Sequence, residues 1–449
     1  MSAVGLVGDA WQLLLLVGAL AGLAIAIGAI VRHPGFGLAL TAIFPIIIWE
    51  SPVAPALVTL QGITIYADDA VALMLAGAAL VNTIRGSVRL ATVHLAAIGL
   101  AIAMILSTLT GTQNFPIGST LVEARQLLFV AIAILWGFTL EWTRSGERSE
   151  LLRRYAWWVL GALVLVALYH GVRYGIGTAD DLLSNSSGEI VQTGRVLTSG
   201  QAALLGMCAI VIVGTAPSER RGPSTSAAVF AGAVLLMSQQ RTAIIAVVAA
   251  AVLYWLAAGA RSKLNGILVL GGVTLTAIVV AASGALNGFL SDLGTSAGST
   301  GTYEGRQAGW MALLADARGQ GAGAVLFGRP FGSGFGRFEN GRWVEYAPHN
   351  FYLTIFLRVG LVGLALLAVF LVAALRQAWR RSTPRWVGAL WVVVVIFGWS
   401  YTWPWYLLPL PVIALAQPLL RHRVVARRVT SSHRRQSSSG RPQLRGVGA

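Results

Sequence analysis

Windows of about twenty consecutive apolar residues recur along most of this chain, from its first residues to about residue 420. As α-helices, windows of that length each cover roughly 30 Å, the thickness of the hydrocarbon core of a membrane. Charged residues make up only 11% of the sequence, whereas soluble globular domains carry about 25%. Helices are the spanning elements that fit this pattern, since they satisfy their own backbone hydrogen bonds in lipid. We therefore predict an all-α polytopic membrane protein.

We predict 12 or 13 transmembrane helices, because some of the apolar segments are short. Residues 36–50 contain Pro45 and are followed by Pro52 and Pro55, a pattern typical of a broken or re-entrant segment. The two segments around Arg241 are also short and have almost no connection between them. The predicted spans cover residues 10–31, 36–50, 69–83, 91–109, 122–141, 155–172, 196–215, 225–240, 241–259, 264–283, 349–375, 386–401 and 404–420.

The formal net charge of +16 follows the connections between these spans. Every second connection is basic, and these connections and the C-terminal tail hold 23 of the 33 lysines and arginines. This positive-inside pattern places the N-terminus outside and the C-terminus in the cytoplasm, and it favours 13 spans. It also explains the charge without a nucleic-acid partner. The residues are Arg32, Arg85, Arg89, Arg144, Arg148, Arg153, Arg154, Arg220, Arg221, Arg261, Lys263, Arg376, Arg380, Arg381, Arg385 and the basic residues from Arg421 onward.

One long polar stretch, residues 284–348, interrupts the apolar chain between its ends. Loops of this length are usually functional, and we predict that this one is extracytoplasmic and contains short helices. The tail is rich in Arg, Ser and Gly, which predicts a disordered segment lying against anionic lipids. The predicted parts are N-terminal transmembrane helices (1–225), further transmembrane helices (226–283), the extracytoplasmic loop (284–348), C-terminal transmembrane helices (349–420) and a basic cytoplasmic tail (421–449).

Arg241 is the strongest candidate for binding an anion. It begins a helix after Ser238-Gln239-Gln240, and no acidic residue is close in sequence. A charge near membrane depth is expensive and indicates a functional site. A guanidinium at a helix N-terminus suits bidentate phosphate binding. The alternative is an arginine whose side chain reaches the outer lipid headgroups.

Three further arginines begin helices on the predicted outer side. Arg306 begins an amphipathic helix in the loop, and its alternative role is an ion pair with Glu304 or Asp316. Arg125 has Glu123 nearby, so an ion pair that only positions the helix is as well supported as a ligand contact. The remaining such residue is Arg195.

His349 is the candidate catalytic base. It follows Pro348 at the end of the polar loop and opens a hydrophobic helix, and histidine exchanges protons near neutral pH. His170, the other histidine on the outer side, fits an interfacial residue without a catalytic role. Arg358 lies roughly 13 Å into the helix opened by His349 and needs a buried partner or a water-lined cavity.

The glycine-rich run at residues 328–338 lacks the spacing of a dinucleotide fingerprint and of a P-loop. It is typical of a tight loop that lets the backbone approach a substrate closely. No His, Asp or Glu cluster has metal-ligand spacing, so we predict no metal site and no cofactor.

Together these motifs resemble the O-antigen ligase/polymerase superfamily of bacterial envelope proteins. The resemblance covers Ser238 to Gly363, about a quarter of the chain. The family often has an acidic residue where Arg358 stands. The matching pieces are Ser238-Gln239-Gln240-Arg241-Thr242-Ala243, Arg306 with Trp310, Gly332-Ser333-Gly334-Phe335-Gly336, and Pro348-His349-Asn350-Phe351-Tyr352-Leu353 running into Gly360-Leu361-Val362-Gly363.

The resemblance implies a membrane glycosyltransferase of the GT-C type in the bacterial cytoplasmic membrane. Such enzymes transfer a glycan from a polyprenyl diphosphate carrier to a lipid or glycan acceptor at the outer face, without metal or nucleotide sugar. His349 is then expected to activate the acceptor hydroxyl, while Arg241 and Arg306 hold the diphosphate. Arg195 and Arg125 are lesser candidates for the same role.

Two alternatives remain open. A polymerase of repeat units would use the same donor and leaving group as a ligase. A transporter or flippase for an anionic lipid or solute would also use outward arginines and many helices. The sequence favours an enzyme, because internal repeats are not evident and acidic residues avoid the predicted spans.

Overall fold

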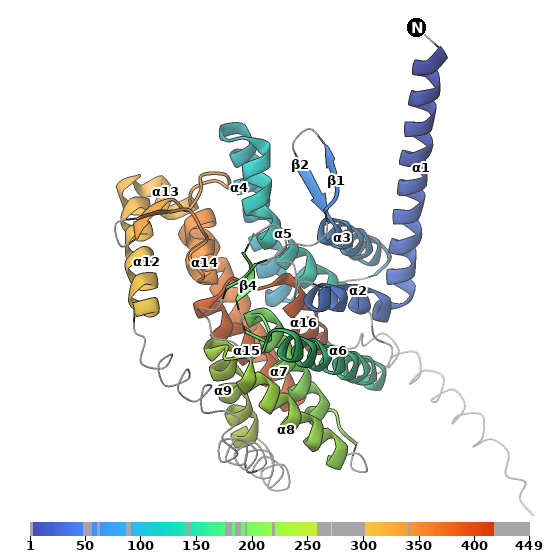
Figure 1. The fold of residues 1–449 in the computed structure, drawn as a ribbon, viewed down its shortest axis with the longest axis vertical. Coiled ribbons are helices and arrows are strands. Elements are labelled where there is room, and N and C mark those ends of the chain that lie inside the picture. Colours follow the sequence, from blue (N-terminus) through green and yellow to red (C-terminus); the bar gives the residue numbers. More distant parts are fainter. Residues whose placement is uncertain are drawn as a thin grey trace, which may run out of the picture.

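The computed structural model describes residues 3–47, 56–60, 63–86, 91–140, 142, 145–175, 182–184, 190–193, 195–217, 221–257, 271, 301–339 and 342–416. Helices make up most of these residues, and Figure 1 shows them gathered into one bundle. Two helices of the polar loop, α12 (Gly301–Gly319) and α13 (Ala322–Phe327), lie at one side of that bundle. The predicted tail at 421–449 and the predicted span at 264–283, apart from Gly271, lie outside the described residues.

Within the described residues, five helices are long and apolar enough to cross a membrane. A sixth candidate is the pair α1 (Ala3–Arg32) and α2 (Pro34–Ile47), which is bent by 113°. The all-α polytopic membrane fold is thereby confirmed. The five are α3 (Ala67–Arg85), α4 (Thr92–Asn114), α5 (Ile117–Thr139), α6 (Ser145–Tyr174) and α14 (Phe351–Ala378).

The remaining long helices of the bundle are shorter than a full span. They are α7 (Ser199–Gly214), α8 (Arg221–Met237), α9 (Arg241–Ala257), α15 (Arg385–Ser400) and the segment of η2 (Trp405–Leu407) and α16 (Pro409–Leu415). The expected count of 12 or 13 thus exceeds the described helices that reach spanning length. Hydropathy locates the apolar segments of the sequence. The length of each helix depends also on turns, such as the turn between α8 and α9.

Three short antiparallel hairpins accompany the helices in the described part of the chain. The third begins at the end of the glycine-rich run and pairs Phe338 with Trp343, so the polar loop contains both helices and strands. The hairpins are β1 (Ala56–Leu60) with β2 (Ile63–Tyr66), β3 (Leu182–Ser184) with β4 (Ile190–Thr193), and β5 (Arg337–Glu339) with β6 (Arg342–Val344).

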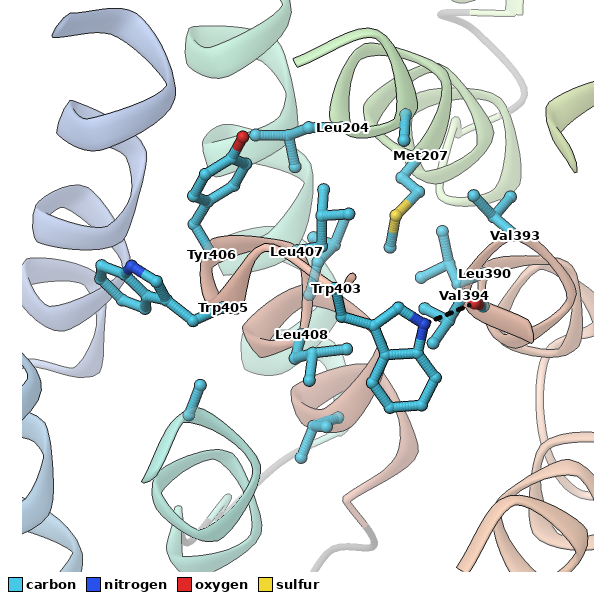
Figure 2. Packing of buried hydrophobic residues seen from close by; sticks show 14 of the residues in the cluster. Leu204, Met207, Leu390, Val393, Val394, Trp403, Trp405, Tyr406, Leu407 and Leu408 are labelled. Carbon is cyan, nitrogen blue, oxygen red and sulfur yellow. Dashed lines mark hydrogen bonds between the residues drawn. The ribbon is translucent and has the colours of Figure 1, made fainter. Parts of the chain in front are cut away.

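The segment after α15 turns back into the centre of the bundle. Figure 2 shows Trp403, Tyr406 and Leu408 packed among side chains of α7 and α15. The indole N–H of Trp403 donates to the carbonyl of Val394 at 2.9 Å, and its ring stacks on Phe351 with centroids 3.8 Å apart. This packing joins the start of α14 and the second half of α15 to the segment that follows α15.

The long helix α14 breaks at Gly360, whose φ of 70° and ψ of −164° are not helical. At the break, the carbonyl of Leu357 accepts a hydrogen bond from the amide of Arg329 at 2.8 Å. The carbonyl of Arg358 accepts one from the hydroxyl of Ser107 on α4 at 2.7 Å. Groups from outside the helix therefore satisfy backbone carbonyls where the helical pattern is interrupted.

We expect Gly360→Ala to destabilise the protein. A Cβ at residue 360 would meet backbone atoms of Leu326 and Gly328, and the positive φ disfavours any residue with a Cβ. Overpacking and strain of this kind cost about 1–3 kcal/mol, measurable as a lower melting temperature in detergent. Gly323→Ala on α13 is the matched control, because a Cβ there meets nothing within 4 Å. Equal melting temperatures for the two variants would contradict this account of the break.

Candidate active site

The starts of α7 and α9 lie at the same end of the bundle. Arg195, just before α7, donates to the side-chain oxygen of Gln240 at 3.2 Å. The side-chain nitrogen of Gln240 donates to the carbonyl of Leu197 at 2.9 Å. Gln240 immediately precedes Arg241, the first residue of α9. The structure therefore brings two of the predicted diphosphate-binding residues, Arg195 and Arg241, to one place.

A tight polar turn, Ser238-Gln239-Gln240, directly precedes α9. Gln239 has a left-handed φ of 52°, and the hydroxyl of Ser238 donates to the carbonyl of Leu235 at 2.6 Å. Ser238, Gln239 and Gln240 are buried, while Arg241 is exposed. The polar motif thus has a structural role, and it presents Arg241 beside the first-turn amides of a helix, an arrangement that suits an anion.

The C-terminal end of α15 lies at the same end of the bundle as the starts of α7 and α9. A Cβ on Gly214, the last residue of α7, would touch the side chain of Trp386 near the start of α15. A Cβ on Gly200, near the start of α7, would touch the side chains of Tyr406 and Pro404, which follow α15. The two helices therefore run in opposite directions. Tyr401 directly follows α15, so it lies at the end where α9 begins.

Arg306 and His349 both contact the ring of Tyr401. The guanidinium carbon of Arg306 lies 5.6 Å from the centre of that ring. The imidazole of His349 meets it edge-on, with ring centroids 6.3 Å apart. His349 is exposed, and Arg306 is partly buried. One aromatic ring thus places the predicted base and a predicted diphosphate-binding residue side by side.

The backbone at His349 is held from both sides. The indole N–H of Trp310 on α12 donates to the carbonyl of Pro348 at 2.6 Å. The side chain of Asn350 caps α14 by accepting the amide of Leu353 at 3.0 Å. His349 itself has a φ of 48°, a conformation that is uncommon outside glycine. Contacts on each side therefore fix a turn that exposes the imidazole.

A small hydrophobic cluster, separate from the main core, fixes α12 to α14. Its buried members are Leu313 and Ala317 of α12, Phe335 of the glycine-rich run, and Leu353 and Leu357 of α14. Trp310 packs against the same cluster. Since α12 carries Arg306 and α14 begins beside His349, this cluster sets the relative position of the two candidate residues.

Arg125 is engaged elsewhere. Its guanidinium forms an ion pair with Asp69 at 3.0 Å and donates to the carbonyl of Thr64 at 2.8 Å. It also lies over the ring of Tyr66, 4.6 Å from the centroid. Its ion-pair partner is Asp69 and not the expected neighbour, Glu123. These contacts tie the start of α5 to the β1–β2 hairpin, which favours the positional alternative for Arg125.

Arg358 has the buried partner that its depth requires. Only 1% of its side chain is exposed, and its guanidinium pairs with Glu123 of α5 at 2.8 Å. Asp316 pairs with Arg329, so among the described ion pairs it is not the partner of Arg306. Three arginines of this region, Arg125, Arg329 and Arg358, are therefore held by carboxylates.

His170 lies apart from the residues around Tyr401. It is fully buried in α6, and its ring packs near Tyr174 with centroids 5.1 Å apart. This packing fits the expectation of a histidine without a catalytic role. Within the described ranges, no group of three or more His, Cys, Asp and Glu side chains has an arrangement that would hold a metal ion.

Tyr401 and Glu123 were not predicted as site residues. Tyr401 is the last residue of the predicted span 386–401, where hydropathy assigns it to lipid. The aromatic run from Trp399 to Tyr406 is a signal of the membrane interface that could have marked it. Glu123 gives no such signal, because its partner Arg358 is distant in sequence.

Residues 226–368 match a family model described as O-antigen ligase. This range contains Arg241, Arg306 and His349, whereas Tyr401, Arg195 and Arg125 lie outside it. No curated protein matches the chain. The match confirms the resemblance drawn from the sequence motifs, and it widens the range from residues 238–363 to residues 226–368.

The chain is therefore a multi-pass membrane protein that contains an O-antigen ligase domain at residues 226–368.

Proposed function

We propose that this protein transfers a glycan from a polyprenyl diphosphate carrier to a lipid or glycan acceptor at the outer face of the bacterial cytoplasmic membrane. One observation carries the proposal. Arg306 and His349, which lie within the family match, contact the same ring of Tyr401, which lies outside it. These residues are at the end of the bundle where Arg241 begins α9. A base and cationic groups at one membrane surface are what this transfer requires.

His349 acts as the general base in this proposal. Its imidazole takes the proton of the acceptor hydroxyl as that oxygen attacks the anomeric carbon of the glycan. The bond between the anomeric carbon and the diphosphate oxygen breaks, and polyprenyl diphosphate leaves with the bonding electrons. The exposure of His349 leaves its ring accessible to an acceptor from the loop side.

Arginines stabilise the leaving group. Negative charge grows on the diphosphate as the bond breaks, and fixed cations aimed at that charge lower the barrier. Arg306, placed by the Tyr401 ring, and Arg241, placed at a helix N-terminus, are the two residues assigned to this role. Arg195 supports Arg241 through Gln240. The guanidinium groups supply the positive charge that the reaction needs, so the proposed reaction is independent of metal ions.

We expect His349→Ala to lower glycan transfer by at least about 100-fold, the usual contribution of a general base. Arg241→Ala is expected to lower transfer by a similar factor through lost stabilisation of the leaving group. Transfer is measured with purified protein, glycan-linked carrier and acceptor. Arg154→Ala on α6 is the control, because that side chain is 73% exposed and pairs with Glu150 rather than with a site residue. Full transfer by both His349→Ala and Arg241→Ala would refute the assignment.

The ring of Tyr401, rather than its hydroxyl, is expected to be the functional part. Tyr401→Phe keeps the surface that Arg306 and His349 contact and should retain transfer. Tyr401→Leu removes that surface and should lower transfer about fivefold, the equivalent of ~1 kcal/mol of lost cation–π interaction. Loss of transfer in the Phe variant would show that the hydroxyl takes part directly, contrary to this account.

A further inference from the structure

The carboxylate of Glu123 is the centre of a compact set of bonds to the glycine-rich run. One of its oxygens accepts the amide of Gly334 at 2.7 Å, and the other accepts the amide of Gly332 at 3.0 Å. That second oxygen also forms an ion pair with the guanidinium of Arg358, at 2.8 Å. Gly332 and Gly334 have φ angles of 92° and 70°, which turn their amides toward the carboxylate.

Arg358 holds the same segment. Its guanidinium donates to the hydroxyl of Ser333 and to the carbonyl of Gly334, the latter at 2.7 Å. It also lies 3.9 Å from the centre of the Phe335 ring. The two side chains together contact four consecutive residues, 332–335. No regular secondary structure holds this segment, so these bonds define its path between α5 and α14.

The pinned segment continues directly into the contacts around His349. The carbonyl of Phe335 accepts the guanidinium of Arg337 at 3.2 Å, and Arg337 also donates to the carbonyl of Tyr346 at 2.9 Å. The ring of Tyr346 lies beside that of His349, with centroids 5.6 Å apart. A displacement at residues 332–335 would therefore be transmitted to the imidazole through two intervening side chains.

The same segment also fixes the helix that carries Arg306. Phe335 is a buried member of the small hydrophobic cluster with Leu313 and Ala317 of α12. The guanidinium of Arg358 lies over the ring of the same Phe335. The position of α12, and with it the contact of Arg306 with Tyr401, thus depends on where Phe335 is held.

We propose that Glu123, acting with Arg358, is a positioning residue for the active site. Its carboxylate fixes residues 332–335 so that His349 and Arg306 meet at Tyr401. The catalytic consequence rests on the proposed function, whereas the structural consequence does not. Glu123 lies on α5, outside the matched residues 226–368. The residue that orders the loop of the matched domain therefore belongs to the N-terminal part of the chain.

Spin labels measure the structural consequence. Gln307→Cys on α12 and Leu109→Cys on α4 are exposed attachment sites, and the single native cysteine, Cys208, is fully buried. We expect a narrow distance distribution in the parent protein and a broad one after Glu123→Gln, which leaves the carboxamide one oxygen to accept the glycine amides. A distribution that stays narrow overturns the proposal, whatever the protein catalyses.

Measurements of transfer and stability distinguish two roles of Glu123: positioning the active site, and only compensating the charge of Arg358. Glu123→Gln is expected to lower kcat at least tenfold, since a small misplacement of reacting groups can cost about 100-fold. The double variant E123Q/R358M removes the buried unpaired charge, so its melting temperature should recover, while the distances stay broad and kcat stays low. Recovery of kcat together with melting temperature would show a merely structural pair and overturn the proposal.

Glu150→Gln is the matched control. Glu150 also pairs with arginines, Arg153 and Arg154, but it does so within α6. We expect its distance distribution and kcat to equal those of the parent. A parent protein without any glycan transfer would refute the proposed function, and the distance distributions would still decide whether Glu123 orders the loop.

Discussion

A carboxylate and a guanidinium below the surface of the bundle hold the polar loop to two long helices. Burying an arginine is costly unless a charge and hydrogen bonds compensate it, and breaking such a pair typically costs about 3–5 kcal/mol. Here the compensation comes from Glu123 together with Ser333 and Gly334. Because loop atoms are also partners of these two side chains, the full set of bonds forms when the loop takes its observed path.

The interruption of α14 belongs to the same arrangement. Gly360 breaks the helix two residues after Arg358, and the amide of Arg329 at the end of α13 satisfies the carbonyl of Leu357. The loop therefore contacts α14 through its backbone at the break and through its glycine-rich run at Arg358. These two attachments restrain residues 329–335, which is the condition for an ordered site in a segment with few regular elements.

The candidate site itself is assembled from helix ends. Arg241 begins α9, His349 immediately precedes the cap of α14, and Tyr401 follows α15. The apolar core positions each helix, and it thereby also positions the polar residues at the end of that helix. Tyr401 has the central place because its ring meets both Arg306 and His349.

Hydropathy and charge placement were sufficient to predict a polytopic helical protein, and the order of motifs was sufficient to identify the family. The partners of the arginines were not predictable in the same way. Arg125 was expected near Glu123 and instead pairs with Asp69, while Glu123 pairs with Arg358. These pairs join different helices, and no local pattern reports which helices become neighbours. Tyr401 was missed for a related reason, since an apolar window does not show where its helix ends.

Release of polyprenyl diphosphate by the purified protein tests the central claim most directly. Glycan-linked polyprenyl diphosphate is supplied with and without an acceptor, and carrier and product are measured by mass spectrometry. The account predicts free polyprenyl diphosphate in an amount equal to the glycosylated acceptor, and only when the acceptor is present. Donor that remains intact in the presence of the acceptor, with folded protein, would contradict it.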